Sequence, residues 1–463
     1  MDQTSLQHLI QTFSPIEKRD AKRFLNSPFF NQRKDLIDLF ELYCHAPDTG
    51  KVMAWQLVVG AETYDDQKFR LLQSYLFKLL EKYLSTKELL SDEASEKLAL
   101  LAAYRKRNAT DAFQHARKSL EKKLAYSPYR NGQFHETQFK LLWETHQLNY
   151  IQNPTDNALL KELSRASDIQ YLSQKLRLIC LLAAHQSVYQ NSDRLDDDQS
   201  VLALASKEEY CNLPAVSIYL LCYNMLTEPD KETHFQQFKS FLISKSGHFS
   251  GSEMHGLFIL AINYCIRKIN AGQDTYSKQV LELYQIGLEK TYLFENDQLS
   301  RFTYYNIVAI GIQTGELEWV RYFINEYKNR LEKKFRESMF SFNLARLEYA
   351  LRNFGFVLEL LQKANYRDIL LNLSAKTLLL KTYHELGERD ALESHMDAMR
   401  NYIHRKRIIG YHRTNYLNVV RYMEKLIRLN LDDRQAVNAF VDSVRKEPVL
   451  SEKSFFLNLG NIR

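Results

Sequence analysis

The run His384-Glu385-Leu386-Gly387-Glu388 is the closest that this chain comes to a catalytic motif. A zinc protease needs two histidines four positions apart on one helical face, with a glutamate beside the first of them as general base. Here Glu388 stands where the second histidine would be, and Gly387 is expected to end the helix. The sequence therefore predicts no zinc site at this position.

Motifs that build nucleotide, redox or hydrolase sites are absent from the sequence. Its fourteen glycines never form GxGxxG, GxxxxGK[ST] or GxSxG, so dinucleotide enzymes, P-loop NTPases and α/β-hydrolases lose their usual sequence support. The five cysteines are too far apart for a CxxC motif, and their odd number argues against a disulfide framework. We therefore predict a protein that is not an enzyme and binds no cofactor or metal. Besides the two non-enzymatic functions considered below, an enzyme whose site is made of dispersed residues in a groove is a third alternative.

Two basic runs are the remaining chemical signal. Residues 101–130 contain eight basic residues against two acids, with Arg105, Lys106 and Arg107 in direct succession, and residues 400–413 contain five basic residues and no acid. A basic stripe on a helix can follow the phosphates of a nucleic acid, but most such runs are solvated outer faces. Nucleic-acid contact through the N-terminal region and the 101–130 segment is therefore the alternative function. Reversing the three successive charges is expected to leave folding intact.

Glycine and proline are scarce, with 14 Gly and 8 Pro in 463 residues, and no proline occurs between Pro229 and Pro448. An interior proline destabilises a helix by about 3 kcal/mol and a glycine by about 1 kcal/mol. A long stretch depleted of both is therefore typical of helices, and the predicted fold class is all-α.

The expected compartment follows from what the sequence lacks. No signal peptide is visible at the N-terminus, and no apolar run approaches the roughly 18 residues that a membrane span needs. The cysteines are expected to be reduced and mostly buried. These features predict a cytoplasmic protein, and a net charge of +6 is too weak at this length to imply a nucleic-acid or membrane partner.

Three regions are predicted: an N-terminal helical head at 1–90, divergent α-hairpin repeats at 91–295, and tetratricopeptide-like repeats with C-terminal capping helices at 296–463. In the head, Ser14-Pro15-Ile16-Glu17 has the serine, proline and glutamate of a helix start. After the head, helical segments alternate with short polar breaks, which predicts antiparallel hairpins stacked as a solenoid.

Three turns in the last region give the repeat length. They fall at Gly315, Arg352 and Gly387, which are 37 and 35 residues apart, close to the roughly 34 residues of a tetratricopeptide unit. The tryptophan, first-helix glycine and closing proline that are usual in that unit are missing, so the match is degenerate. The predicted architecture is a right-handed superhelical array of antiparallel α-hairpins behind the head.

Three stretches resemble an uncharacterised bacterial family of helical-repeat proteins of about this length. They are SPFFN at Ser27–Asn31, YDDQKFRLL at Tyr64–Leu72, and LLLKTYHELGERDALESHMDAMRNYI at Leu378–Ile403. The resemblance covers the head and the C-terminal third, and the family carries no assigned activity. It therefore implies a fold of helical repeats and no chemistry.

The concave face of such an array is the main candidate for a functional surface, because solenoids bind peptides and proteins there. In tetratricopeptide-like pairs, residues 2, 5, 9 and 12 of the unit point into the groove. Counting back from the three turns places there Phe302, Tyr305, Ala309 and Ile312, then Met339, Phe342, Arg346 and Tyr349, then Ser374, Thr377, Lys381 and His384. The alternative is that several of these side chains simply pack against the next hairpin.

This strip is aromatic at one end and basic at the other, which suits an extended segment with apolar anchors and an acidic end. We therefore predict a non-enzymatic intracellular scaffold that binds a peptide or protein partner. The residues expected to contact the partner are Tyr305, Phe342, Arg346, Tyr349, Lys381 and His384. The partner and the oligomeric state are not indicated by the sequence.

Overall fold

The chain is almost entirely helical over the residues that its structure describes, which confirms the all-α fold class. The structure is a computed structural model. It describes residues 4–60, 63–155, 157–189, 198–363, 366, 368–406 and 410–458.

The contacts divide the chain into two compact units, and each is described by itself. The first comprises Met1–Leu182 and Asn191–Tyr223, and the second comprises Ala183–Gln190 and Asn224–Arg463. The predicted boundary after residue 90 lies inside the first unit, and the one after residue 295 lies inside the second.

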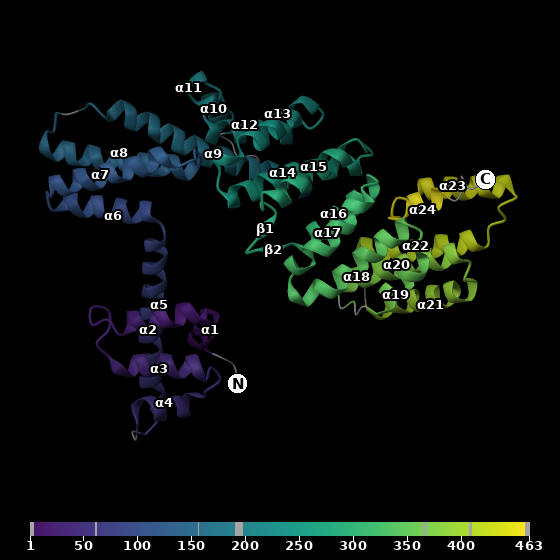
Figure 1. Cartoon of the computed structure of the whole chain (residues 1–463), viewed down its shortest axis with the longest axis horizontal. Helices are drawn as coiled ribbons and strands as arrows, with labels where there is room; N and C mark the ends of the chain where they lie inside the picture. The colour runs from purple at the N-terminus through teal and green to yellow at the C-terminus, as the bar shows by residue number, and fades with distance from the viewer. Residues whose placement is uncertain are drawn as a thin grey trace. The chain divides into compact units, whose positions relative to one another are not determined.

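The first unit begins with the predicted head, five helices around one core (Figure 1, purple to blue). They are α1 (Ser5–Thr12), α2 (Pro15–Leu25), α3 (Lys34–His45), α4 (Lys51–Val59) and α5 (Asp66–Ser91). The expected capping box starts α2, because the Ser14 side chain accepts from the Glu17 amide and the Glu17 side chain accepts from the Ser14 amide. Leu39, Trp55 and Phe69 are buried in the core of the head.

The rest of the first unit continues as helices, of which α9 and α12 extend into the second unit. They are α6 (Glu93–Lys106), α7 (Thr110–Tyr126), α8 (Gly132–Gln152), α9 (Leu160–Tyr189), α10 (Asp198–Ala205), α11 (Glu208–Cys211) and α12 (Pro214–Thr227). Helix α6 packs against α7 and α8, and Leu101, Phe113 and Leu148 are buried in the core of this region.

The second unit is a series of helices with one small hairpin. It contains α13 (Glu232–Ser244), η1 (Ser246–His248), α14 (Gly251–Asn270), α15 (Tyr276–Glu289), β1 (Phe294–Glu295), β2 (Gln298–Leu299), α16 (Arg301–Gln313), α17 (Leu317–Tyr327), η2 (Lys328–Arg330), α18 (Lys333–Ala350), α19 (Phe354–Lys363), α20 (Ile369–Leu386), α21 (Arg389–Arg405), α22 (Gly410–Ile427), α23 (Arg434–Lys446) and α24 (Lys453–Asn458).

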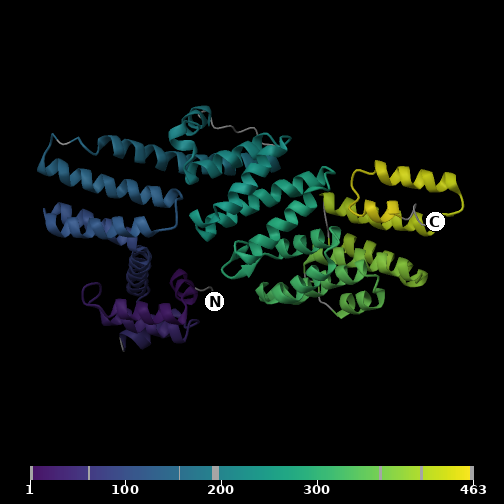
Figure 2. The same ribbon diagram turned by 45° about the horizontal axis from the view of Figure 1, so that its top comes forward.

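Helices from α14 to α22 pack on their successors along the chain, and alternate helices also meet (Figure 1; Figure 2). Contacts join α16 to α18, α18 to α20 and α20 to α22. The first helices of successive pairs therefore share one face, and it is these four helices that position the candidate site.

The β1–β2 hairpin was not anticipated from the sequence. Its strands pair antiparallel around Asn296 and Asp297, whose φ angles are 49° and 63°. Two left-handed residues between paired strands are typical of a two-residue hairpin turn, and Asn and Asp tolerate that conformation. An Asn-Asp pair between two-residue strands is too short a pattern to stand out in a helical chain.

The three predicted turns are confirmed, and two further helices end in the same way. Gly315, Arg352 and Gly387 have φ angles of 81°, 61° and 73°. In each, the next amide donates to a carbonyl five residues back, over 2.9, 2.8 and 3.0 Å, which is the Schellman closure of a helix. The same closure occurs at Asn108 and Gly272.

Arg352 and Gly387 should respond in opposite directions to substitution. A left-handed conformation disfavours a residue with a Cβ by about 1 kcal/mol, and a Cβ at Gly387 would meet nothing within 4 Å. We expect Gly387→Ala to lower the free energy of unfolding by about 1 kcal/mol and Arg352→Gly to raise it by about 0.5 kcal/mol. Urea unfolding followed by circular dichroism measures both, and a shift of the same sign in the two variants would contradict the turn assignment.

Candidate binding groove

A cavity of about 570 Å³ in the second unit is the candidate site, and we call it the groove cavity. Its wall comes from α16, α18, α20, α22 and the turn before α24. Eight of the twelve residues predicted to face a groove line it: Tyr305, Ile312, Phe342, Arg346, Tyr349, Ser374, Thr377 and Lys381. The structure thus brings together residues from all three predicted repeat units.

The other four predicted residues do not line the groove cavity. Phe302 lines a separate cavity of about 700 Å³ beside the β1–β2 hairpin. Met339 is buried and Ala309 is half-buried. His384 lies one turn beyond Lys381 with its ring 5.8 Å from that of Phe455, and burial lowers the pKa of its imidazole. His384 is therefore covered by α24. Contrary to the prediction, it does not face the cavity.

One wall of the groove cavity is a stack of two rings and a guanidinium. The rings of Tyr305 and Phe342 lie 6.0 Å apart and nearly parallel, and the Arg346 guanidinium lies 4.3 Å from the centre of the Tyr305 ring. Arg346 Nη1 also donates to the Tyr305 carbonyl and to Asn343 Oδ1, each over 3.2 Å. These contacts hold the guanidinium in place, and among the described residues no carboxylate pairs with it.

Lys381 has an internal partner that its position in the repeat did not predict. Its Nζ lies 2.9 Å from Glu452 Oε2, and the two side chains are 17% and 27% exposed. The same ammonium lies 4.9 Å from the centre of the Tyr349 ring. The expected basic end of the groove is therefore partly neutralised by a carboxylate 71 residues further along the chain.

Thr377 and Tyr349 contribute hydroxyl groups to the cavity wall; Thr377 is buried and Tyr349 is half-buried. Thr377 is 4% exposed, and its hydroxyl has no hydrogen-bond partner among the residues that the structure describes. By contrast, Thr382 on the same helix donates to the Leu378 carbonyl over 2.8 Å. Burial, with a smaller contribution from Glu385, raises the pKa of Tyr349, so its phenol stays neutral.

Helix α22 completes the cavity, and the sequence analysis placed it only among the C-terminal capping helices. It adds Tyr411, His412, Asn415 and Tyr416, together with Ser451 and Glu452 from the turn before α24. Asn415 holds that turn, since its Nδ2 donates to Ser451 Oγ over 3.0 Å and its Oδ1 accepts from the Ser451 amide over 2.7 Å. A signal was available, because a further step of 34 residues leads from Thr377 to Tyr411 and from Lys381 to Asn415.

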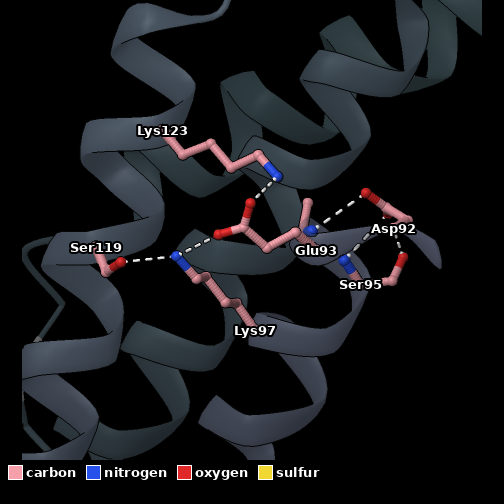
Figure 3. A network of polar contacts seen from close by, with 7 residues as sticks. Asp92, Glu93, Ser95, Lys97, Ser119 and Lys123 are labelled. Carbon is pink, nitrogen blue, oxygen red and sulfur yellow. Dashed lines mark hydrogen bonds and ion pairs between the residues drawn. The ribbon is translucent and has the colours of Figure 1, made fainter. Parts of the chain in front are cut away.

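Part of the basic segment in the first unit is engaged in ion pairs within the chain. Glu93 lies 2.8 Å from both Lys97 and Lys123, and Lys97 also donates to Ser119 over 2.7 Å (Figure 3). The hydrogen bonds from Lys123 and Lys97 lower the pKa of Glu93 to about 2. Lys123 is thus paired with a carboxylate that stays ionised at neutral pH.

Arg105 is partly buried, whereas its neighbours Lys106 and Arg107 are exposed. Its Nε lies 2.7 Å from Glu144 Oε2 on α8, with the two side chains 19% and 15% exposed. Arg105 is therefore not the exposed charge that the prediction of intact folding after the triple reversal assumes.

The head helices do not have the connection of a helix-turn-helix. That motif joins its two helices by a turn of three or four residues. The described head helices are joined by residues 13–14, 26–33, 46–50 and 60–65. The loops between the head helices therefore give no support to nucleic-acid contact through a helix-turn-helix.

Neither a metal site nor a membrane span is found within the described ranges. No three His, Cys, Asp or Glu side chains there lie close enough together to hold a metal ion. Nor does any described helix combine the length and the apolar character needed to cross a bilayer. No protein-family model, no curated protein and no solved structure matches this chain.

Proposed function

We propose that this protein is a non-enzymatic scaffold that binds an extended peptide segment of a partner protein in the groove cavity. The observation that supports this most strongly is the convergence of eight residues, from three successive predicted units, on one cavity of about 570 Å³. Rings on its wall can take apolar anchors of the segment, and the hydroxyl, amide and guanidinium groups between them can bind its backbone and polar side chains.

The proposed architecture of the second unit is a right-handed superhelical array of tetratricopeptide-like pairs. Its support is the Schellman closure repeated at Gly315, Arg352 and Gly387, together with the contacts that join alternate helices. We further propose that the scaffold acts in the cytoplasm, where cysteines such as the free, buried Cys180, Cys222 and Cys265 stay reduced.

A matched pair of tyrosines tests the proposed function. Tyr411 lines the groove cavity, Tyr322 lies on α17 outside it, and each is 59% exposed. Peptides are selected from a displayed random dodecapeptide library on the intact chain, and their affinities are measured by fluorescence anisotropy. We expect Tyr411→Ala to weaken binding about tenfold, the scale of an aromatic contact residue, and Tyr322→Ala to change it less than twofold.

Three outcomes would count against peptide binding in the groove cavity. They are a library that yields no specific peptide, selected peptides that bind Tyr411→Ala as tightly as the unaltered chain, and a larger loss in Tyr322→Ala than in Tyr411→Ala. Thermal melts of both variants control for folding, because neither exposed ring belongs to the buried core.

A further inference from the structure

Arg346 on α18 and Thr377 on α20 both line the groove cavity, at about the same level along their two neighbouring helices. Helices α18 and α20 run in the same direction, because α19 returns between them. At one end of the cavity Phe342 meets the ring of Tyr366, just before α20, with 6.5 Å between centres. At the other end the Tyr349 ring lies 4.9 Å from the Lys381 ammonium. Arg346 precedes Tyr349 by one turn, and Thr377 precedes Lys381 by one turn, so the two residues lie at about the same level between these contacts.

Each of the two residues has hydrogen-bonding capacity that the chain leaves unused. The Thr377 hydroxyl is enclosed without a partner, although a carbonyl of the preceding helical turn could accept its proton, as Leu378 does for Thr382. The Arg346 guanidinium has five N–H donors, and Nη1 makes the two hydrogen bonds described above, to the Tyr305 carbonyl and to Asn343 Oδ1. A guanidinium held by ring stacking is well suited to bidentate contact with a carboxylate.

The charges around the cavity determine which anion fits. Three residues that line the cavity have a fixed formal charge, and they are Arg346, Lys381 and Glu452. Two of these charges are positive and one is negative, which leaves one positive charge in excess. Since Lys381 is already paired with Glu452, that excess resides on Arg346. One carboxylate balances it, whereas a dianionic phosphate would leave a net negative charge near Glu452.

We infer that Arg346 and Thr377 form a subsite for one acidic side chain, a glutamate or aspartate within the bound peptide segment. This inference rests on the proposed function and names the chemistry that the groove cavity selects. The Tyr305, Phe342 and Tyr349 rings on the same wall would contact apolar residues on either side of the acid. Lys381, which the sequence placed among the partner contacts, serves as the internal partner of Glu452.

Four pentapeptide libraries test the subsite on the immobilised full chain. Three of them are blocked at both ends and have Glu, Gln or phosphoserine as the fixed central residue. The fourth has Gln at the centre and is left unblocked at its C-terminus, so that it carries a free carboxylate there. Retained peptides are quantified by mass spectrometry. We expect the Glu library to be retained about tenfold more than each of the others, and Arg346→Met to reduce that preference to less than twofold. Equal retention of the Glu and Gln libraries, or preference for phosphoserine or the free C-terminus, would overturn the inference.

Two threonines on α20 separate a binding role from a structural one. Thr377→Val removes an unpartnered hydroxyl, so we expect a melting temperature about 2 °C higher and about fivefold less retention of the Glu library. Thr382→Val removes the bond to Leu378, so we expect a lower melting temperature and unchanged retention. Undiminished retention by Thr377→Val would refute the subsite, whatever happens to Arg346→Met.

The outcomes for the two proposals can be told apart. If displayed peptides bind at Tyr411 but the Glu and Gln libraries are retained equally, the scaffold proposal stands and the carboxylate subsite falls. If no peptide of any kind binds, both fall.

Discussion

Arg105→Glu should lower the free energy of unfolding by about 3 kcal/mol, because removing one partner of a largely buried ion pair leaves the other charge uncompensated. Arg105 Nε and Glu144 Oε2 lie 2.7 Å apart, and the two side chains are 19% and 15% exposed. A second contact, from Arg105 Nη2 to Glu144 Oε1 over 3.4 Å, makes the pair bidentate. The substitution would place two carboxylates together between α6 and α8.

Lys106→Glu is the matched control, since Lys106 is the next residue on α6 and is exposed. It should change the free energy of unfolding by no more than about 0.5 kcal/mol. The exchange Arg105→Glu with Glu144→Arg should recover part of the loss. Urea denaturation followed by circular dichroism gives all three values. Equal stabilities of Arg105→Glu and Lys106→Glu would show that the pair contributes nothing.

Gly311→Ala should lower the free energy of unfolding by about 2 kcal/mol, within the range for overpacking a core. An added Cβ would lie 2.3 Å from Val320 Cγ2, and both residues are fully enclosed where α16 packs on α17. Because that distance is far below van der Waals contact, the two helices would have to separate or Val320 would have to move.

Gly256→Ala provides the opposite case, because its Cβ would meet nothing within 4 Å on the exposed face of α14. Replacing an unhindered helical glycine by alanine should raise the free energy of unfolding by about 0.5 to 1 kcal/mol. In the double variant Gly311→Ala with Val320→Ala, the loss should be smaller than the sum of the single losses. Additive losses would mean that the close approach of the two residues does not set the helix spacing.

The features that could be predicted from the sequence are local ones. The turns at Gly315, Arg352 and Gly387 were recognisable because a left-handed helix end interrupts the apolar pattern at a regular interval. Once these turns were placed, the 3.6-residue period indicated which side chains share a face. That reasoning brought Tyr305, Arg346 and Lys381 to one cavity across three helix pairs.

The features that could not be predicted depend on residues distant in the chain. Nothing near Lys381 indicates Glu452, and nothing near Arg105 indicates Glu144, 39 residues away. From the sequence alone, Lys381 and Arg105 therefore could not be distinguished from exposed charges that have no partner within the chain. His384 satisfied the repeat position but is covered by Phe455 of α24, because the turn before α24 and the start of that helix pack at the end of the groove.

The packing of helices against their near neighbours in the chain, described above for α14 to α22, has a consequence for cooperativity. In such a series, stability is close to a sum of local terms and nearest-neighbour interfaces. A change that destabilises one helix pair then also destabilises the adjacent pairs, and its effect on stability decreases with distance along the chain. Loosening α16 and α17 would loosen the wall at Tyr305 while leaving the head core at Phe69 folded. The second unit could therefore open its groove one helix pair at a time, without a global unfolding event.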